Sequence, residues 1–163
     1  MDEGRLAAAL SGVLGKTLSA ELAADFVKIR RDYATKVLER AAPGKFVETF
    51  VQCLQHLDKG TYEAKPSVDQ YLDKTVLQTG LSEDLRVCAA RIARSIYTLR
   101  NKRNIAHKNP VDPNTADLAY IHSGATWIMA DLIRHATGIS MQEAGDLIEL
   151  LHVPVGTLVE DID

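Results

Sequence analysis

The chain has 163 residues, of which 46% are hydrophobic and 25% charged, and its formal net charge is −3. This composition is typical of a globular protein and excludes disordered and fibrous chains, while the negative charge excludes a protein that binds nucleic acid over its whole surface. No apolar run approaches the roughly 20 residues that span a bilayer, and the acidic N-terminus does not resemble a secretory signal, so we expect a cytoplasmic protein without a membrane segment.

Apolar residues recur at spacings of three and four along most of the chain, and this periodicity predicts an all-α fold. A weak first helix is expected over about residues 4–14, and a second over about 19–41. Pro43 and Gly44 interrupt the pattern before a third helix that runs to about residue 57. Ser67 is the predicted N-cap of a short fourth helix, which ends near Gly80.

Two long helices are predicted next, over about residues 83–107 and 113–137, and the short link between them predicts that they lie antiparallel. Ser82 is the expected N-cap of the first, whose apolar stripe is Leu85, Cys88, Ile92, Ile96 and Leu99. The sequence from Ser140 to Glu143 is typical of a capping box and opens a last helix to about residue 152. Residues 1–153 are therefore predicted to form a single α-helical bundle.

The tail, residues 154–163, differs in character because it is rich in β-branched residues, ends in acidic ones, and could form a strand. Two interpretations stay open for it. It is a simple terminal extension, or it is the start of a missing C-terminal segment.

Several short sequence patterns are only weak evidence for a ligand site or an active site. GVLGKT, residues 12–17, lacks the first glycine and the preceding strand of a phosphate-binding loop. Cys53 and Cys88 are expected to be core residues, and no metal site or cofactor is predicted. Asp131 and His135 are four residues apart on one helix, but no nucleophile stands out beside them, so we expect an ordinary surface pair.

A basic segment is the strongest signal in the sequence. Residues 86–108 contain seven of the nineteen basic residues and no acidic residue. The dipole of a helix favours cations at its C-terminal end, which accounts for the last turn but not for Arg86, Arg91 and Arg94. A patch that binds the phosphates of RNA is the other explanation. Its candidate residues are Arg91, Arg94, Lys102, Arg103, Asn104 and Lys108.

Helical geometry places Arg100, Arg103 and His107 on nearly one side of this helix. An imidazole can transfer a proton near neutral pH, and a guanidinium can hold a phosphate and offset negative charge in a transition state. These groups suit RNA cleavage without a metal ion. From spacing alone, however, an arginine and a histidine on one helical face are weak evidence for catalysis.

The run YTLRNKRNIAHKNP, followed by a helix within DPNTADLAYIHSGATWIMADLIRHATG, resembles the HEPN superfamily. Its motif is an arginine, four to six residues and a histidine, with a polar residue after the arginine. Arg100, Asn101 and His107 fit with six intervening residues, whereas Arg103 is too close to His107 to fit. The resemblance is clearest over about residues 82–137, and the chain is also similar to uncharacterised bacterial proteins of the abortive-infection type.

The resemblance implies a helical bundle that dimerises so that two motif helices face a shared cleft. Active members of this superfamily are metal-independent endoribonucleases of toxin–antitoxin, abortive-infection and CRISPR-associated systems. It further implies that Arg100 contacts the scissile phosphate, that His107 acts as the acid or base, and that Asn101 positions one of them.

We therefore expect a homodimeric endoribonuclease domain of prokaryotic defence or stress response, with RNA as its substrate. An antitoxin or an additional C-terminal domain is a possible partner. Other members of the superfamily only bind nucleotide or RNA, or serve as dimerisation modules. The alternative is thus a non-catalytic RNA-binding or dimerisation module of a larger regulatory protein.

Overall fold

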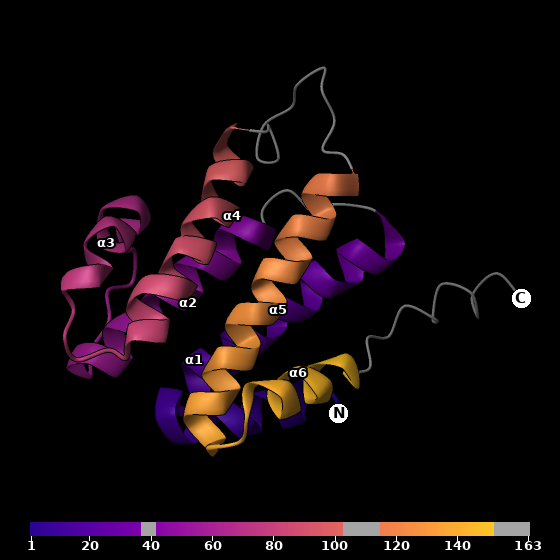
Figure 1. Ribbon diagram of the computed structural model, residues 1–163, viewed down its shortest axis with the longest axis horizontal. Coiled ribbons are helices and arrows are strands. Elements are labelled where there is room, and N and C mark those ends of the chain that lie inside the picture. Colours follow the sequence, from indigo (N-terminus) through magenta and orange to yellow (C-terminus); the bar gives the residue numbers. More distant parts are fainter. Residues whose placement is uncertain (37–41, 103–114, 152–163) are drawn as a thin grey trace, which may run out of the picture.

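The computed structural model describes residues 1–36, 42–102 and 115–151, and every regular element in these ranges is helical, which confirms the all-α fold (Figure 1). A 3-10 turn, η1 (Thr75–Leu77), and a π-helix, η2 (Asp84–Ala89), lie between α3 and α4. The α-helices are α1 (Glu3–Thr35), α2 (Ala42–Lys59), α3 (Val68–Lys74), α4 (Ala90–Lys102), α5 (Thr115–Thr137) and α6 (Met141–Glu149).

The long helix α1 is bent at Gly15, whose dihedral angles of φ 78° and ψ 167° are not helical. Glycine adopts a positive φ without the steric penalty of a side chain, so the bend falls between the two helices that the sequence predicts. The Met1 ammonium, just before α1, donates to the carbonyl of Leu150, just after α6, at 3.3 Å. Arg30, in the second part of α1, donates to the carbonyl of Glu149, the last residue of α6, at 3.4 Å.

The second part of α1 ends earlier than the predicted limit of residue 41. Thr35 is its last helical residue, and Lys36 adopts the left-handed conformation with φ 60°. The prediction for the next boundary is wrong as well, because Pro43 and Gly44 lie inside α2 and do not precede it. Proline suits the first turn of a helix, where its missing N–H leaves no intrahelical bond unmade.

A single hydrophobic core is formed where α1 packs against α2 and α5. Its largest side chains are fully buried, and the rings of Phe26 and Phe46 have centroids 6.4 Å apart. By length and hydropathy α1 could also cross a membrane, but the core helix of a soluble protein passes the same test. A signal sequence near the N-terminus passes it as well, and Leu10, Leu18 and Phe26 of α1 are buried in this core.

The predicted helix over 83–107 begins as expected but does not keep one helical pitch. The Ser82 hydroxyl accepts the Leu85 N–H at 3.4 Å, and Ala90 then donates to the Leu85 carbonyl, five residues back, as in a π-helix. This wider turn shifts the phase of the apolar stripe. Cys88, predicted for the core, is exposed and Ala89 is buried, whereas Cys53 is buried as predicted.

The second half of the chain follows the sequence closely. Gly138, with φ 78°, ends α5, and the Ser140 hydroxyl accepts the Glu143 N–H at 3.1 Å, which confirms the capping box. The predicted inward face of α5 is buried throughout: Leu118, Ile121, Ala125, Ile128 and Leu132.

The expected pair of long antiparallel helices is not clearly the centre of the fold. α5 does run antiparallel to η2 and α4, since Ser95 contacts Tyr120 and Asp84 contacts Arg134. However, α1 is the longest described helix and lies against both α2 and α5, while α4 is described only to Lys102. The tail, residues 154–163, lies outside the described residues.

Candidate functional site

The predicted site residues are only partly within the described ranges. Arg103, Asn104, His107 and Lys108 lie outside them. The remaining five, all on α4, are Arg91, Arg94, Arg100, Asn101 and Lys102.

The described candidates do not form one patch. Arg91 and Arg100 are nine residues apart, which at about 100° per residue puts them on opposite sides of α4. Arg94 is paired with Asp73 of α3, and Lys102 is exposed. Arg91, a predicted RNA-binding residue, and Arg100, a predicted catalytic residue, therefore lie on different surfaces of the helix.

The side chain of Arg100 contacts two neighbours on its own helix, α4, and one residue at the start of α2. Its Nη1 donates to Asn101 Oδ1 at 2.9 Å, and its guanidinium carbon lies 5.6 Å from the centre of the Tyr97 ring. A Cβ added to Gly44 would lie only 2.7 Å from Nε. These contacts restrain the guanidinium of Arg100.

The free edge of this guanidinium borders a hollow of about 290 Å³ lined by Gly44, Lys45, Glu48, Tyr97 and Arg100. Nη2 makes no hydrogen bond to the described residues, while Nε is buried against Gly44 without a partner among them. Two cations, Arg100 and Lys45, thus share the hollow with a single carboxylate, that of Glu48. The first turn of α2 adds the positive end of a helix dipole, so the hollow favours an anion such as a phosphate.

Sequence reasoning missed Gly44, Lys45 and Tyr97. Pro43 and Gly44 predict a helix break, and nothing in the local sequence connects them with position 100. Tyr97, three residues before Arg100, offered the one usable signal, because residues three apart on a helix are neighbours.

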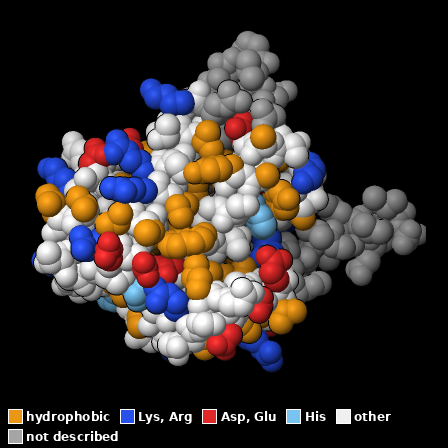
Figure 2. Space-filling view, in the orientation of Figure 1, with side chains coloured by type: hydrophobic (Ala, Val, Ile, Leu, Met, Phe, Trp, Pro, Cys, Tyr) orange, Lys and Arg blue, Asp and Glu red, His pale blue; other side chains and the backbone are white. Residues whose placement is uncertain are grey.

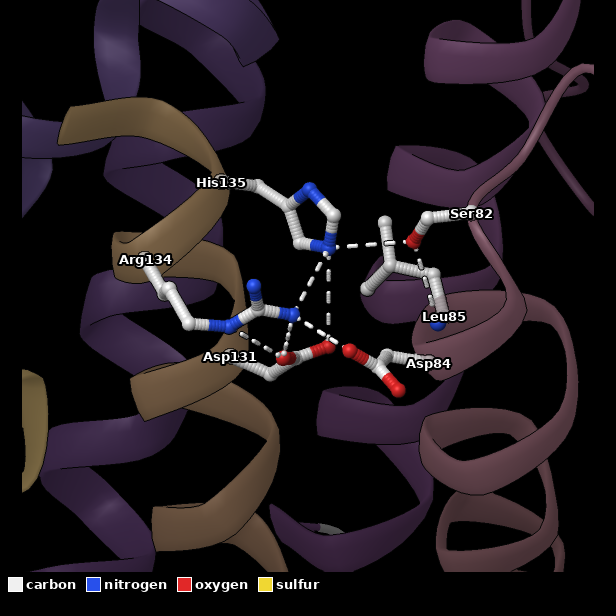
Figure 3. A network of polar contacts seen from close by, with 6 residues as sticks. All are labelled: Ser82, Asp84, Leu85, Asp131, Arg134 and His135. Carbon is white, nitrogen blue, oxygen red and sulfur yellow. Dashed lines mark hydrogen bonds and ion pairs between the residues drawn. The ribbon is translucent and has the colours of Figure 1, made fainter. Parts of the chain in front are cut away.

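A second polar cluster joins the end of α5 to the start of η2 (Figure 3). Asp131 is only 1% exposed, so its prediction as half of a surface pair is wrong. Arg134 donates to Asp131 Oδ1 at 2.8 Å and to Asp84, and its pKa is raised, chiefly by the hydrogen bond with Asp131. The Ser82 hydroxyl lies 3.0 Å from His135 Nε2, and sequence reasoning missed this contact too.

This cluster contains serine, histidine and aspartate but lacks the geometry of a nucleophilic triad. Ser82 and Asp131 approach the same ring nitrogen of His135, Nε2, at 3.0 and 3.8 Å. In a triad the serine and the carboxylate bond to different nitrogens of the histidine. One nitrogen takes the serine proton, and the carboxylate at the other nitrogen stabilises the positive charge that the ring gains. The Ser82 hydroxyl also caps η2. The cluster therefore fastens η2 to α5.

Within the described ranges, no group of three or more histidine, cysteine, aspartate or glutamate side chains could hold a metal ion. The described part of the candidate site is a half-buried guanidinium beside a hollow of about 290 Å³. Comparison with known proteins adds no template for it: the chain matches no protein-family model, no curated protein and no solved structure.

Proposed function

We propose that this chain is a HEPN-like, metal-independent endoribonuclease domain in which Arg100 binds the scissile phosphate and His107 transfers protons. Asn101 positions Arg100. The proposed setting is the prokaryotic cytoplasm, where the domain acts as a homodimer in defence or stress response. An antitoxin or an additional C-terminal segment is the proposed further partner.

The observation that carries this proposal is the way Arg100 is held. The dipole of a helix favours an arginine at its C-terminal end without fixing the side chain, which is normally free to move in water. Here the guanidinium of Arg100 is restrained by Tyr97, by Asn101 and by the backbone at Gly44, which has no side chain. One edge of the guanidinium faces a hollow that is lined in part by Lys45. Preorganised donors of this kind stabilise the charge that develops on a phosphate in the transition state.

The proposed reaction is a transesterification within the RNA strand. The 2′-oxygen forms a bond to phosphorus, and the bond from phosphorus to the 5′-oxygen breaks. A base removes the 2′-hydroxyl proton and an acid protonates the leaving 5′-oxygen, so the products are a 2′,3′-cyclic phosphate and a 5′-hydroxyl. His107 carries out one of these proton transfers, and the charge on the phosphate oxygens is met by Arg100.

The test is cleavage of a long single-stranded RNA in excess EDTA, with identification of the new ends. Wild type is expected to cleave it to cyclic-phosphate and 5′-hydroxyl ends, and His107→Ala to leave it intact. His56→Ala is the matched control, because His56 lies near the other end of α2 from the Arg100 hollow. The proposal fails if wild type leaves the RNA intact, or if His107→Ala cleaves as fast as wild type while both remain helical.

The half-burial of Arg100 supports a second candidate function, a non-catalytic RNA-binding module. Its Nη1 already has an acceptor within the chain, which would suit a guanidinium that shapes a surface and takes no part in a reaction. For such a module, RNA binding survives His107→Ala and weakens steeply with added salt, and no RNA is consumed.

A further inference from the structure

A groove of about 620 Å³ lies between α4 and α5, away from the Arg100 hollow. Figure 2 shows an apolar band that runs down the visible face, where α4 and α5 lie side by side in Figure 1. The volume falls within the range of about 300–1,000 Å³ that is usual for sites that bind small organic groups. The groove is lined by Arg91, Arg94, Ser95, Thr98, Leu99, Ala116, Asp117 and Tyr120.

One aromatic ring in this groove is both exposed and fixed. Tyr120 is 47% exposed, and its hydroxyl lies 2.7 Å from Ser95 Oγ. The single proton of Ser95 goes to the Ile92 carbonyl at 2.7 Å, so Tyr120 must be the donor in the bond between the two hydroxyls. The ring is thus anchored at its far end while much of its surface remains open. A flat partner can stack on it without first ordering it.

The charges at the groove favour an anionic occupant. Arg91 is exposed and forms no ion pair with an acidic side chain of the described residues, while the charge of Arg94 is offset by Asp73. The acidic residue of the lining, Asp117, is only 7% exposed and is engaged within the chain. An apolar floor, a fixed aromatic ring and an arginine without an acidic partner in the described part of the chain match a ligand with a flat base and a phosphate.

We propose that this groove is a base-binding subsite for single-stranded RNA, in which a nucleobase stacks on Tyr120 and a neighbouring phosphate binds Arg91. This inference rests on the proposed function and adds a second contact surface, on the side of α4 opposite to Arg100. Stacking on an aromatic side chain accepts any base. The subsite therefore adds affinity for bases in general and little sequence preference.

The test is binding of two fluorescein-labelled probes by the full chain, measured by anisotropy. One probe is an octamer of 2′-O-methyl-riboadenylate, and the other is an abasic strand of the same length and sugar; neither has the 2′-hydroxyl that cleavage requires. We expect Tyr120→Leu to weaken binding of the octamer about tenfold, the usual effect of losing one stacked base, and to leave binding of the abasic strand unchanged. Tyr120→Phe should retain most of the affinity. Arg91→Gln should weaken binding of both probes.

Tyr62→Leu is the matched control, because Tyr62 is similarly exposed, at 42%, but lies in the segment between α2 and α3. The proposal is overturned if wild type binds both probes equally, or if Tyr120→Leu and Tyr62→Leu behave alike. It is also overturned if Tyr120→Leu only dissociates a protein dimer in sedimentation and leaves RNA binding intact.

Failure of the subsite is distinguishable from failure of the proposed function. If Tyr120→Leu has no effect while wild type cleaves long RNA in EDTA, the subsite is wrong and the endoribonuclease proposal stands. If wild type binds neither probe and cleaves no RNA, both are wrong.

Discussion

Substitution of Gly44 by alanine separates the stability of the fold from the position of Arg100. The added Cβ would lie 2.7 Å from Nε and 3.1 Å from Cζ of Arg100, and real Cβ atoms essentially never come closer than 3.0 Å to such a neighbour. The end of a flexible side chain gives way more easily than backbone, so the guanidinium should be displaced. Alanine also suits a helix better than glycine by about 0.5–1 kcal/mol.

The expected result is a protein that is slightly more stable and much less active. A gain of about 0.5 kcal/mol raises the melting temperature of a chain of this size by about 1–2 °C. Displacement of a positioned group by about 1 Å can cost a hundredfold in rate, so we expect cleavage of RNA to slow by about ten- to a hundredfold. Thermal unfolding and single-turnover cleavage in EDTA measure the two effects.

Gly12→Ala is the control, because Gly12 lies within α1 and an added Cβ there meets nothing within 4 Å. It should give the same gain in stability with an unchanged rate. The reasoning is refuted if Gly44→Ala cleaves RNA as fast as Gly12→Ala. A large loss of stability in Gly44→Ala would show instead that Arg100 cannot move aside.

Three further predictions concern the fold. Arg134→Ala removes the donor to the buried Asp131 and should lower the free energy of unfolding in urea by about 2 kcal/mol. Asp84→Ala breaks only an exposed ion pair and should lower it by less than about 1 kcal/mol. Equal losses for the two variants would contradict this. Burial raises the pKa of Asp25 above 3.8, so the folded chain binds this proton more tightly than the unfolded chain, and stability must fall as the pH rises from about 3.8 through the folded pKa. Asp25→Asn should remove this fall, which urea titrations at several pH values measure. Parallel plots of stability against pH for wild type and Asp25→Asn would refute the prediction. Cys88 is exposed, whereas burial raises the pKa of the Cys53 thiol. A thiol reagent should therefore react with Cys88 in the folded chain and with Cys53 only in denaturant. Equally fast reactions of the two cysteines would contradict this.

Local signals made much of the fold predictable from the sequence. The capping box at Ser140, the stop at Gly138 and the apolar face of α5 depend on residues within one or two turns of each other, and each appears where it was expected. The break in α1 follows from the conformational freedom of Gly15.

What the sequence did not reveal depends on contacts between distant residues. Helical periodicity says which side of a helix is apolar, but it does not say which partner lies opposite a given polar residue. The contact of Arg100 with Gly44 and that of His135 with Ser82 are of this kind. The π-helix was also missed, because a one-residue widening of a turn depends on tertiary packing, and Cys88 was misplaced as a result.

The central claim is that Arg100 binds the scissile RNA phosphate and is not simply one of several cations at the end of a charged helix. Single-turnover cleavage of one RNA in EDTA by Arg100→Ala and Lys102→Ala tests it most directly, because both variants remove one cation from the last turn of α4. The account predicts that Arg100→Ala slows cleavage by about a hundredfold or more, while Lys102→Ala stays within a few-fold of wild type. Equal rates for the two variants, whether both fast or both slow, would contradict it.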